Sequence, residues 1–166
     1  MVFLFISVLG LHRAFALERE FDAIGLVLSA PVDRSYIFLS KWLSGTIFLL
    51  VSQLVIVPLF WLFLHLSIPE NLGGWIFLFL ITDLGILAIG SLVSGITMRA
   101  RMGEILLPIL LFPLVSPLLI AAVKSTDALM NNLEFNEWKI WMQLIVTFVV
   151  VFAVTGYVIF DYVSEQ

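Results

Sequence analysis

Long apolar segments alternate with short polar segments along most of this chain. A transmembrane helix needs about 20 largely apolar residues to cross the hydrocarbon core of a bilayer. Four segments meet this requirement, and each is expected to span a membrane: residues 37–66, 74–98, 105–123 and 140–162. The pattern predicts an all-α, polytopic membrane protein in which residues 1–166 form a single transmembrane domain.

The first apolar run, within residues 1–14, is too short to span a membrane alone, and His12 and Arg13 close it. We therefore expect it to be the second half of a transmembrane helix that begins before Met1. A cleaved signal peptide is the alternative, because residues 14–16 resemble a small-x-small cleavage site. That alternative is disfavoured because no basic region precedes the apolar run.

Residues 15–36, the most polar stretch between apolar runs, are expected to form an amphipathic helix on the cytoplasmic side. From Leu17, apolar residues recur at i, i+4, i+7 and i+11, which places them on one helical stripe. The charged residues fall on other faces, and Pro31 ends the helix because it lacks an amide donor. Such a helix is suited to contact a partner protein. Its candidate contact residues are Glu18, Glu20, Phe21, Asp22, Ile24 and Arg34.

The composition excludes several classes of protein. Hydrophobic residues make up 62% of the chain and charged residues 12%, whereas soluble proteins contain about 25% charged residues. The chain has no cysteine, which rules out disulfides and thiolate sites. The net charge of −4 is spread along the chain without a basic patch, so membrane lipid is an expected partner and nucleic acid is not.

Basic residues predict the orientation of the spans. If residues 15–41 are cytoplasmic, Arg99 and Arg101 are cytoplasmic as well, and only the two lysines of residues 124–139 lie outside. Lysine and arginine in short loops favour the cytoplasmic side, so this orientation is preferred. We expect Arg99 and Arg101 to anchor a cytoplasmic turn in which Glu104 can pair with Arg101. Residues 124–139 are expected to form a long outer loop.

The second span contains an ionisable residue, Asp83, and small residues spaced four apart, such as Gly90 with Ser94. Small residues let helices approach closely, either inside one subunit or between subunits. An aspartate within a membrane span is a functional candidate because its charge is costly there. The alternatives are that Asp83 lies nearer the outer surface or is capped by Thr82.

The third span contains Pro108, Pro113 and Pro117. Each proline removes a backbone donor, so this span is not expected to be a straight, fully bonded helix. Irregular backbone at membrane depth persists only against protein or a water-filled cavity. We interpret the three prolines, together with Asp83, as candidates for a pathway or a hinge, with a plain structural kink as the alternative.

Motifs for catalysis and nucleotide binding are missing from the sequence. It contains no G-x-x-x-x-G-K-[ST], H-E-x-x-H or G-x-S-x-G motif and no histidine and carboxylate cluster at metal-ligand spacing, so neither catalytic nor metal-binding residues are expected. His12 and His65 are the only two histidines. Imidazole can ligate haem iron, which makes them candidate haem contacts. A hydrogen-bonding role at the membrane surface is the alternative for both.

Four stretches of the sequence carry a resemblance to a known family. They read APVDRSYIFLSK at residues 30–41, LGILAIGS at 84–91, RARMGEILLP at 99–108 and FPLVSPLLIAA at 112–122. In this order and spacing they resemble the family of haem exporter protein B, the permease subunit of the cytochrome c maturation ABC transporter. The resemblance covers most of the chain from about residue 15 to residue 123, whereas the last span matches only in hydrophobic character.

The resemblance implies six spans in an inner (cytoplasmic) membrane and a separate ATP-binding subunit, cytochrome c maturation protein A. It implies that residues 15–36 couple to this ATPase, and that partner subunits C and D complete the complex. Haem would be the transported ligand, with no firmly bound cofactor and ATP used only through the partner. Against this pattern, we expect the first span and the start of the second to be missing from this chain. Its amphipathic segment also lacks the leading glycine of the family.

Three hypotheses for function remain open. The first is a permease of an ABC-type haem exporter required for cytochrome c maturation, which is a transporter subunit and not an enzyme. The second is a non-conducting scaffold that couples an ATPase to haem-handling partners. The third is an export permease for a lipid or drug.

Overall fold

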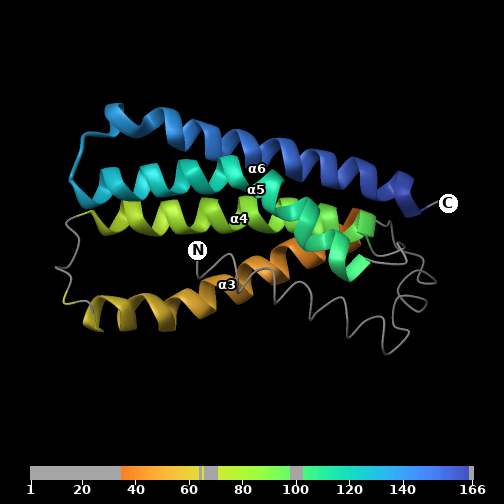
Figure 1. The fold of residues 1–166 in the computed structure, drawn as a ribbon, viewed down its shortest axis with the longest axis horizontal. Helices are drawn as coiled ribbons and strands as arrows, with labels where there is room; N and C mark the ends of the chain where they lie inside the picture. The colour runs from red at the N-terminus through yellow and green to blue at the C-terminus, as the bar shows by residue number, and fades with distance from the viewer. Residues whose placement is uncertain (1–34, 64, 66–70, 98–102, 165–166) are drawn as a thin grey trace.

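A computed structural model describes residues 35–63, 65, 71–97 and 103–164 (Figure 1). Within these residues the regular structure is entirely α-helical, which confirms the expected all-α membrane fold. Residues 1–14 and the coupling residues up to Arg34 lie outside the described part of the chain. The described helices are α3 (Ser35–Phe63), α4 (Leu72–Thr97), α5 (Gly103–Met130) and α6 (Phe135–Ser164).

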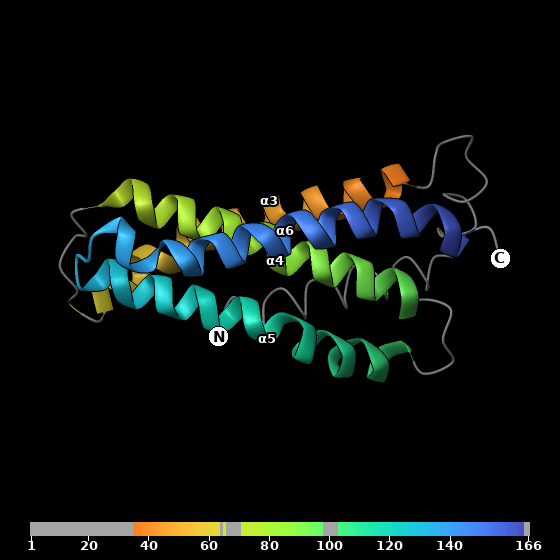
Figure 2. The same ribbon diagram turned by 90° about the horizontal axis from the view of Figure 1, so that it is seen from above.

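Each of the four described helices contains a segment of 25 or 26 residues that is long and apolar enough to cross a membrane. Helices that follow each other in the sequence run in opposite directions. The starts of α3 and α5 and the ends of α4 and α6 therefore lie at the same end of the bundle (Figures 1 and 2). We call this the inner end, because it is the end that the basic residues predict to be cytoplasmic. The opposite end is the outer end.

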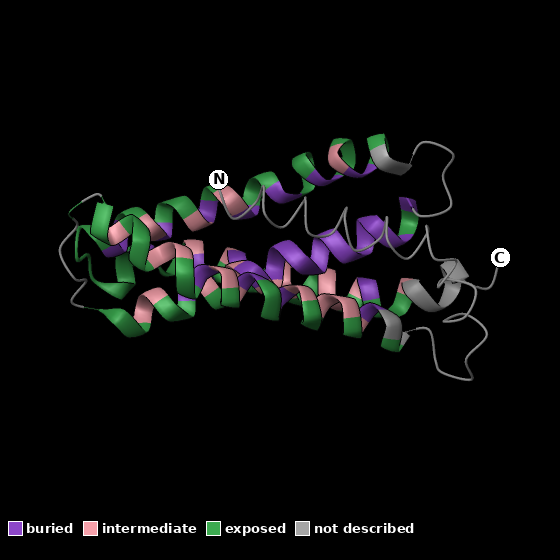
Figure 3. Ribbon diagram, turned by 90° about the horizontal axis from the view of Figure 1, so that it is seen from below, coloured by how far each residue is buried: buried purple, intermediate pink, exposed green. Residues whose placement is uncertain are grey.

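Helix α4 is the centre of the bundle. Its most apolar window is 67% buried inside the protein, against 17% to 28% for the windows of α3, α5 and α6. Helix α4 packs against all three of these helices, and Figure 3 shows burial concentrated along it. The small residues of α4, such as Gly90 and Ser94, are buried in this packing. They therefore serve contacts within the subunit.

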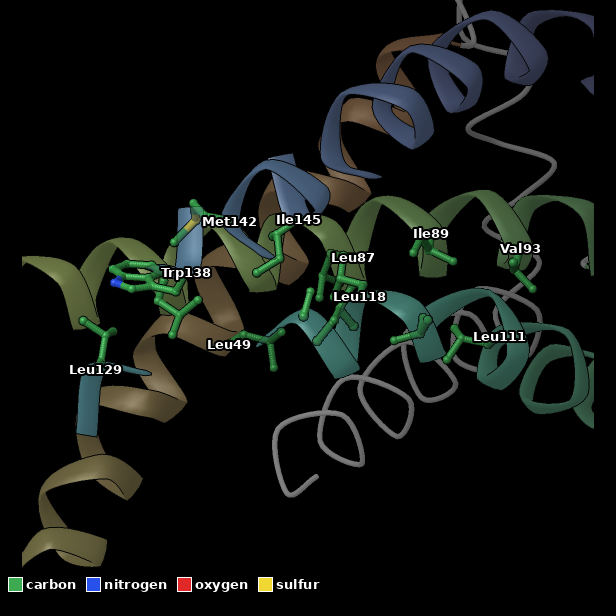
Figure 4. Packing of buried hydrophobic residues seen from close by; sticks show 14 of the residues in the cluster. Leu49, Leu87, Ile89, Val93, Leu111, Leu118, Leu129, Trp138, Met142 and Ile145 are labelled. Carbon is green, nitrogen blue, oxygen red and sulfur yellow. The ribbon is translucent and has the colours of Figure 1, made fainter. Parts of the chain in front are cut away.

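The core contains side chains from every described helix (Figure 4). Helix α5 contributes Leu111, Val115 and Leu118, which recur at i, i+4 and i+7 and form one buried stripe. At the outer end, Trp138 and Met142 of α6 lie beside the end of α5 (Figure 4). Many large apolar side chains outside the core are exposed, as expected of helices that face lipid.

The connection between α5 and α6 is shorter than the sequence predicts. A loop was expected over residues 124–139, but α5 continues to Met130 and α6 begins at Phe135. The prediction was wrong because a helix can extend past the apolar core into the polar interface, where charged residues such as Lys124 are tolerated. The span over residues 105–123 is accordingly part of a longer helix.

Local hydrogen bonds explain where two of these helices begin and end. The side-chain Oδ1 of Asn71 accepts a hydrogen bond from the Gly74 amide at 2.9 Å, which caps the start of α4. At the end of α5, Asn132 has a positive φ of 51°. The amides of Asn132 and Leu133 donate to the carbonyls of Leu129 and Ala128. This is the Schellman arrangement, in which asparagine tolerates the left-handed conformation.

Substitution of Gly85 tests the packing around α4. A Cβ at this position would collide with the Leu118 side chain of α5 and approach Val149 of α6 to 3.3 Å. We expect Gly85→Val to lower the free energy of unfolding by about 1–3 kcal/mol, because overpacking displaces both neighbours. The measurement is denaturant unfolding of the purified protein in detergent.

Gly73 provides the matched control for this substitution. It is exposed in the first turn of the same helix, and the nearest atom to an added Cβ is 3.9 Å away. Gly73→Val should change stability much less than Gly85→Val. Equal effects of the two substitutions would show that α4 is not closely packed at Gly85.

Candidate functional site

Asp83 lies in the middle of the membrane-spanning helix α4. It is the twelfth of 26 residues, so it lies roughly 17 Å from the helix start at 1.5 Å per residue. Its side chain is 1% exposed. Its Oδ1 accepts a hydrogen bond of 2.9 Å from the side-chain Nε2 of Gln53. Asp83 therefore lies at membrane depth, and its partner is on α3, in contrast to the two alternatives of a surface position and a Thr82 cap.

Gln53 is the site residue that the sequence analysis missed. It is the only side-chain amide in the apolar segment 37–66, and it is buried. A lone amide in a span is a usable signal, because polar side chains in membranes bond across helices. The hydrogen bond between Gln53 and Asp83 provides one polar link between α3 and α4.

Trp42 provides a second polar link between the same two helices. Its indole Nε1 donates to the main-chain carbonyl of Leu84 at 2.8 Å. Its ring also stacks on Phe38 with 6.0 Å between ring centroids. Two side chains of α3 thus bond to adjacent residues of α4. We call Trp42, Gln53, Asp83 and Leu84 the α3–α4 clamp.

Several buried polar atoms of α4 have no hydrogen-bond partner in the described part of the chain. They are the second carboxyl oxygen of Asp83 and the hydroxyl oxygens of Thr82, Ser91 and Ser94. Ser91 and Ser94 are each 1% exposed, so these hydroxyls lie in the interior of the protein. Polar groups in such positions are costly. Residues 82–94 of α4 therefore combine extensive burial with several costly polar atoms.

The prolines of α5 lie within one continuous helix, in which the axis changes direction partway along its length (Figures 1 and 2). Pro113 and Pro117 are exposed on the outside of the bundle, and Pro108 is half-buried. On the same outer face, Ser116 Oγ donates to the Phe112 carbonyl at 2.6 Å. Back-bonding of this kind bends helices. The two exposed prolines therefore do not line the described core.

Two of the other candidate positions, His65 and Glu104, lie in the described part of the chain. His65 is exposed, has a φ of 51° and follows the end of α3. Glu104 lies in the first turn of α5, and only its backbone belongs to the described part of the chain. The residues outside the described part are His12, Glu18, Glu20, Phe21, Asp22, Ile24, Arg34, Arg99 and Arg101. Among the described residues, no group of histidine and carboxylate side chains is arranged to hold a metal ion.

The apolar helices and the polar clamp at their centre define a multi-pass α-helical membrane protein. Residues 1–160 match the family described as CcmB protein, and the chain belongs to this family. The chain is also similar to heme exporter protein B of Rhodobacter capsulatus, with 32% identity over 112 residues. This match covers 68% of the chain and 51% of the relative, so the matched region spans about half of that curated protein. No solved structure matches the chain significantly.

Substitution of the exposed prolines tests the bend in α5. We expect Pro113→Ala with Pro117→Ala to straighten the helix, because each substitution restores a backbone donor without removing a core contact. Each substitution should also stabilise the helical conformation of α5 by up to about 3 kcal/mol. The chain has no native cysteine, so spin labels can be attached to single cysteines at Ile105 and Val123, which are exposed.

The distance between the two labels is the measurement. The labelled positions would be about 27 Å apart along a straight helix, and the double substitution should lengthen the distance towards this limit. Leu114→Ala, an exposed position in the same helix, is the control and should leave the distance unchanged. The same distance in the double variant and the parent protein would mean that these prolines do not bend α5.

Proposed function

We propose that this chain is a membrane permease subunit of an ABC-type haem exporter complex required for cytochrome c maturation. The observation that carries the proposal is the match of residues 1–160 to the CcmB family. The relative from Rhodobacter capsulatus is a heme exporter protein, which supports haem as the transported ligand. The proposed location is the inner (cytoplasmic) membrane, where the complex delivers haem to the periplasmic side.

ATP hydrolysis is assigned in this proposal to a separate subunit, cytochrome c maturation protein A. The sequence has no phosphate-binding loop of its own, and residues 15–36 combine an apolar stripe with a charged face. We propose that this segment docks the ATPase and that partner subunits C and D complete the assembly. Haem and ATP are thus a transported ligand and a partner's substrate, and neither is a resident cofactor of this chain.

The order of elements along the chain offers a route for mechanical coupling. The proposed docking segment leads directly into α3, and α3 is hydrogen-bonded to the central helix α4 through the α3–α4 clamp. Movement of the ATPase would therefore reach α3 first and α4 next. The buried position of Asp83 and the bend of α5 are the features that such a movement would act on.

Loss of holo-cytochrome c on deletion of the protein tests the proposed function. We expect deletion in the native host to remove most holo-cytochrome c, and a plasmid copy of the parent sequence to restore it. Normal cytochrome levels in the deletion strain would contradict a haem-linked role and favour a lipid or drug exporter. Haem flux into proteoliposomes containing the complete complex then separates a conducting permease from a scaffold.

Docking of the ATPase is tested by charges placed on the apolar stripe. Phe21→Asp with Ile24→Asp should abolish co-purification of the ATP-binding subunit, because two carboxylates would interrupt the apolar contact surface. Leu133→Asp is the control, since this exposed residue lies in the turn at the outer end. The assay is a pull-down from detergent-solubilised membranes with equal amounts of inserted protein. Undiminished recovery of the ATPase would place its docking surface elsewhere.

A further inference from the structure

Helix α3 is attached to α4 through a short stripe of buried side chains. Of the α3 side chains that the structure describes, only Phe38, Thr46, Leu49 and Gln53 are buried. They follow one helical stripe, and the half-buried Trp42 lies on it as well. Beyond Gln53 the side chains of α3 are exposed or half-buried. The attachment of α3 therefore ends at Gln53.

The two polar contacts of this stripe converge on a single turn of α4. Trp42 and Gln53 are eleven residues apart in the sequence, or about 16 Å along a helix axis. Their side-chain donors nevertheless reach Leu84 and Asp83, which are adjacent. Trp42 lies closer to the inner end of α3 and Gln53 closer to the outer end, so the two side chains approach the Asp83–Leu84 pair from opposite directions. A shift of α3 along its axis in either direction would break at least one of the two hydrogen bonds.

Close packing between the two donors makes this arrangement specific. Leu49 is 1% exposed and belongs to the core. Gly45 lies against the side chain of Leu87, so that any Cβ at position 45 would collide with it. At the inner end, Phe38 similarly fills the space beside Gly156 of α6. The glycine contact and the two hydrogen bonds together define one position of α3 on α4.

We infer that Trp42 and Gln53 are positioning residues that fix α3 in one register on α4 through the Asp83–Leu84 turn. This inference rests on the proposed function, because α3 is the element through which the docking segment would act. In the membrane interior, water does not compete for these donors, and separation would leave the buried Asp83 without its Gln53 partner. The two hydrogen bonds therefore stabilise a single position of α3 on α4, and the ATPase has to break them in order to shift α3.

Cysteine cross-linking measures this register directly. The chain has no native cysteine, so Gly45→Cys with Leu87→Cys provides a unique pair at a close contact between α3 and α4. The smaller cysteine at position 87 removes the leucine atoms with which a Cβ at position 45 would collide. The pair is placed in the full-length protein, expressed with its partner subunits in native membranes. Oxidative cross-linking is followed over time, and holo-cytochrome c is measured in the same strains. We expect efficient cross-linking in this parent pair.

Removal of the two donors should loosen the contact. Trp42→Phe removes the indole N–H but keeps an aromatic ring, and Gln53→Leu removes the amide at similar size. We expect the two together to slow cross-linking by about tenfold, given the usual strength of hydrogen bonds between membrane helices. The matched controls are Trp61→Phe, beyond the attached part of α3, and Gln143→Leu, which is exposed on α6. Both controls should cross-link at the parent rate.

Asp83 distinguishes positioning from carboxylate chemistry. In Asp83→Asn the side-chain oxygen still accepts from Gln53, so cross-linking and cytochrome assembly should both resemble the parent. Asp83→Leu cannot accept this hydrogen bond, and it should slow cross-linking because Gln53 then has no partner on α4. If Asp83→Asn instead fails as Asp83→Leu does, the carboxyl group itself is required and the positioning role is overturned.

An unchanged cross-linking rate in Trp42→Phe with Gln53→Leu would overturn the inference, whatever happens to the cytochromes. Failure of the proposed function gives a different result. In that case cross-linking would still depend on the two donors, while deletion of the protein would leave cytochrome c assembly intact. The conservative substitutions and the immunoblotted amount of inserted protein separate loosening of α3 from loss of folding.

Discussion

The need to satisfy polar groups inside a hydrocarbon layer is the constraint on which this structure depends. Lipid offers no hydrogen bonds, so a buried carboxyl group at the depth of Asp83 has to find its partner within the protein. The partner is Gln53 of α3, and this contact ties a helix with little buried surface to the most buried helix of the bundle. Apolar packing brings the helices together, and the polar contacts determine where α3 lies on α4.

The sequence predicted those features that depend on composition over many residues. Continuous apolar segments of spanning length identified the membrane fold, and Asp83 stood out because a charge is rare in such a segment. The end of α5 could not be predicted in this way. Its helix continues past Lys124, with Ser125 fully buried, because helical hydrogen bonding does not stop where hydropathy falls. Hydropathy therefore identified the four apolar helices but not where α5 ends.

Pairing between distant residues was beyond the reach of sequence patterns. Tryptophan is typical of the membrane interface, so nothing in the sequence indicated that Trp42 donates to the carbonyl of Leu84. The same limit applied to α5, where proline spacing predicted bending but not the direction in which Pro113 and Pro117 face. These properties depend on how α3 and α5 are rotated against α4. That rotation is set by three-dimensional packing of individual side chains, such as Leu87 against Gly45.

The Schellman turn at Asn132 makes the outer end of the bundle asymmetric. With only residues 131–134 between them, the outer ends of α5 and α6 are tethered at short range. The sequence between α3 and α4 is longer, at eight residues, and no described side chain of α3 beyond Gln53 is fully buried. An opening of this end towards the outer surface would therefore form on the α3 side, while α5 and α6 stayed together as a hairpin.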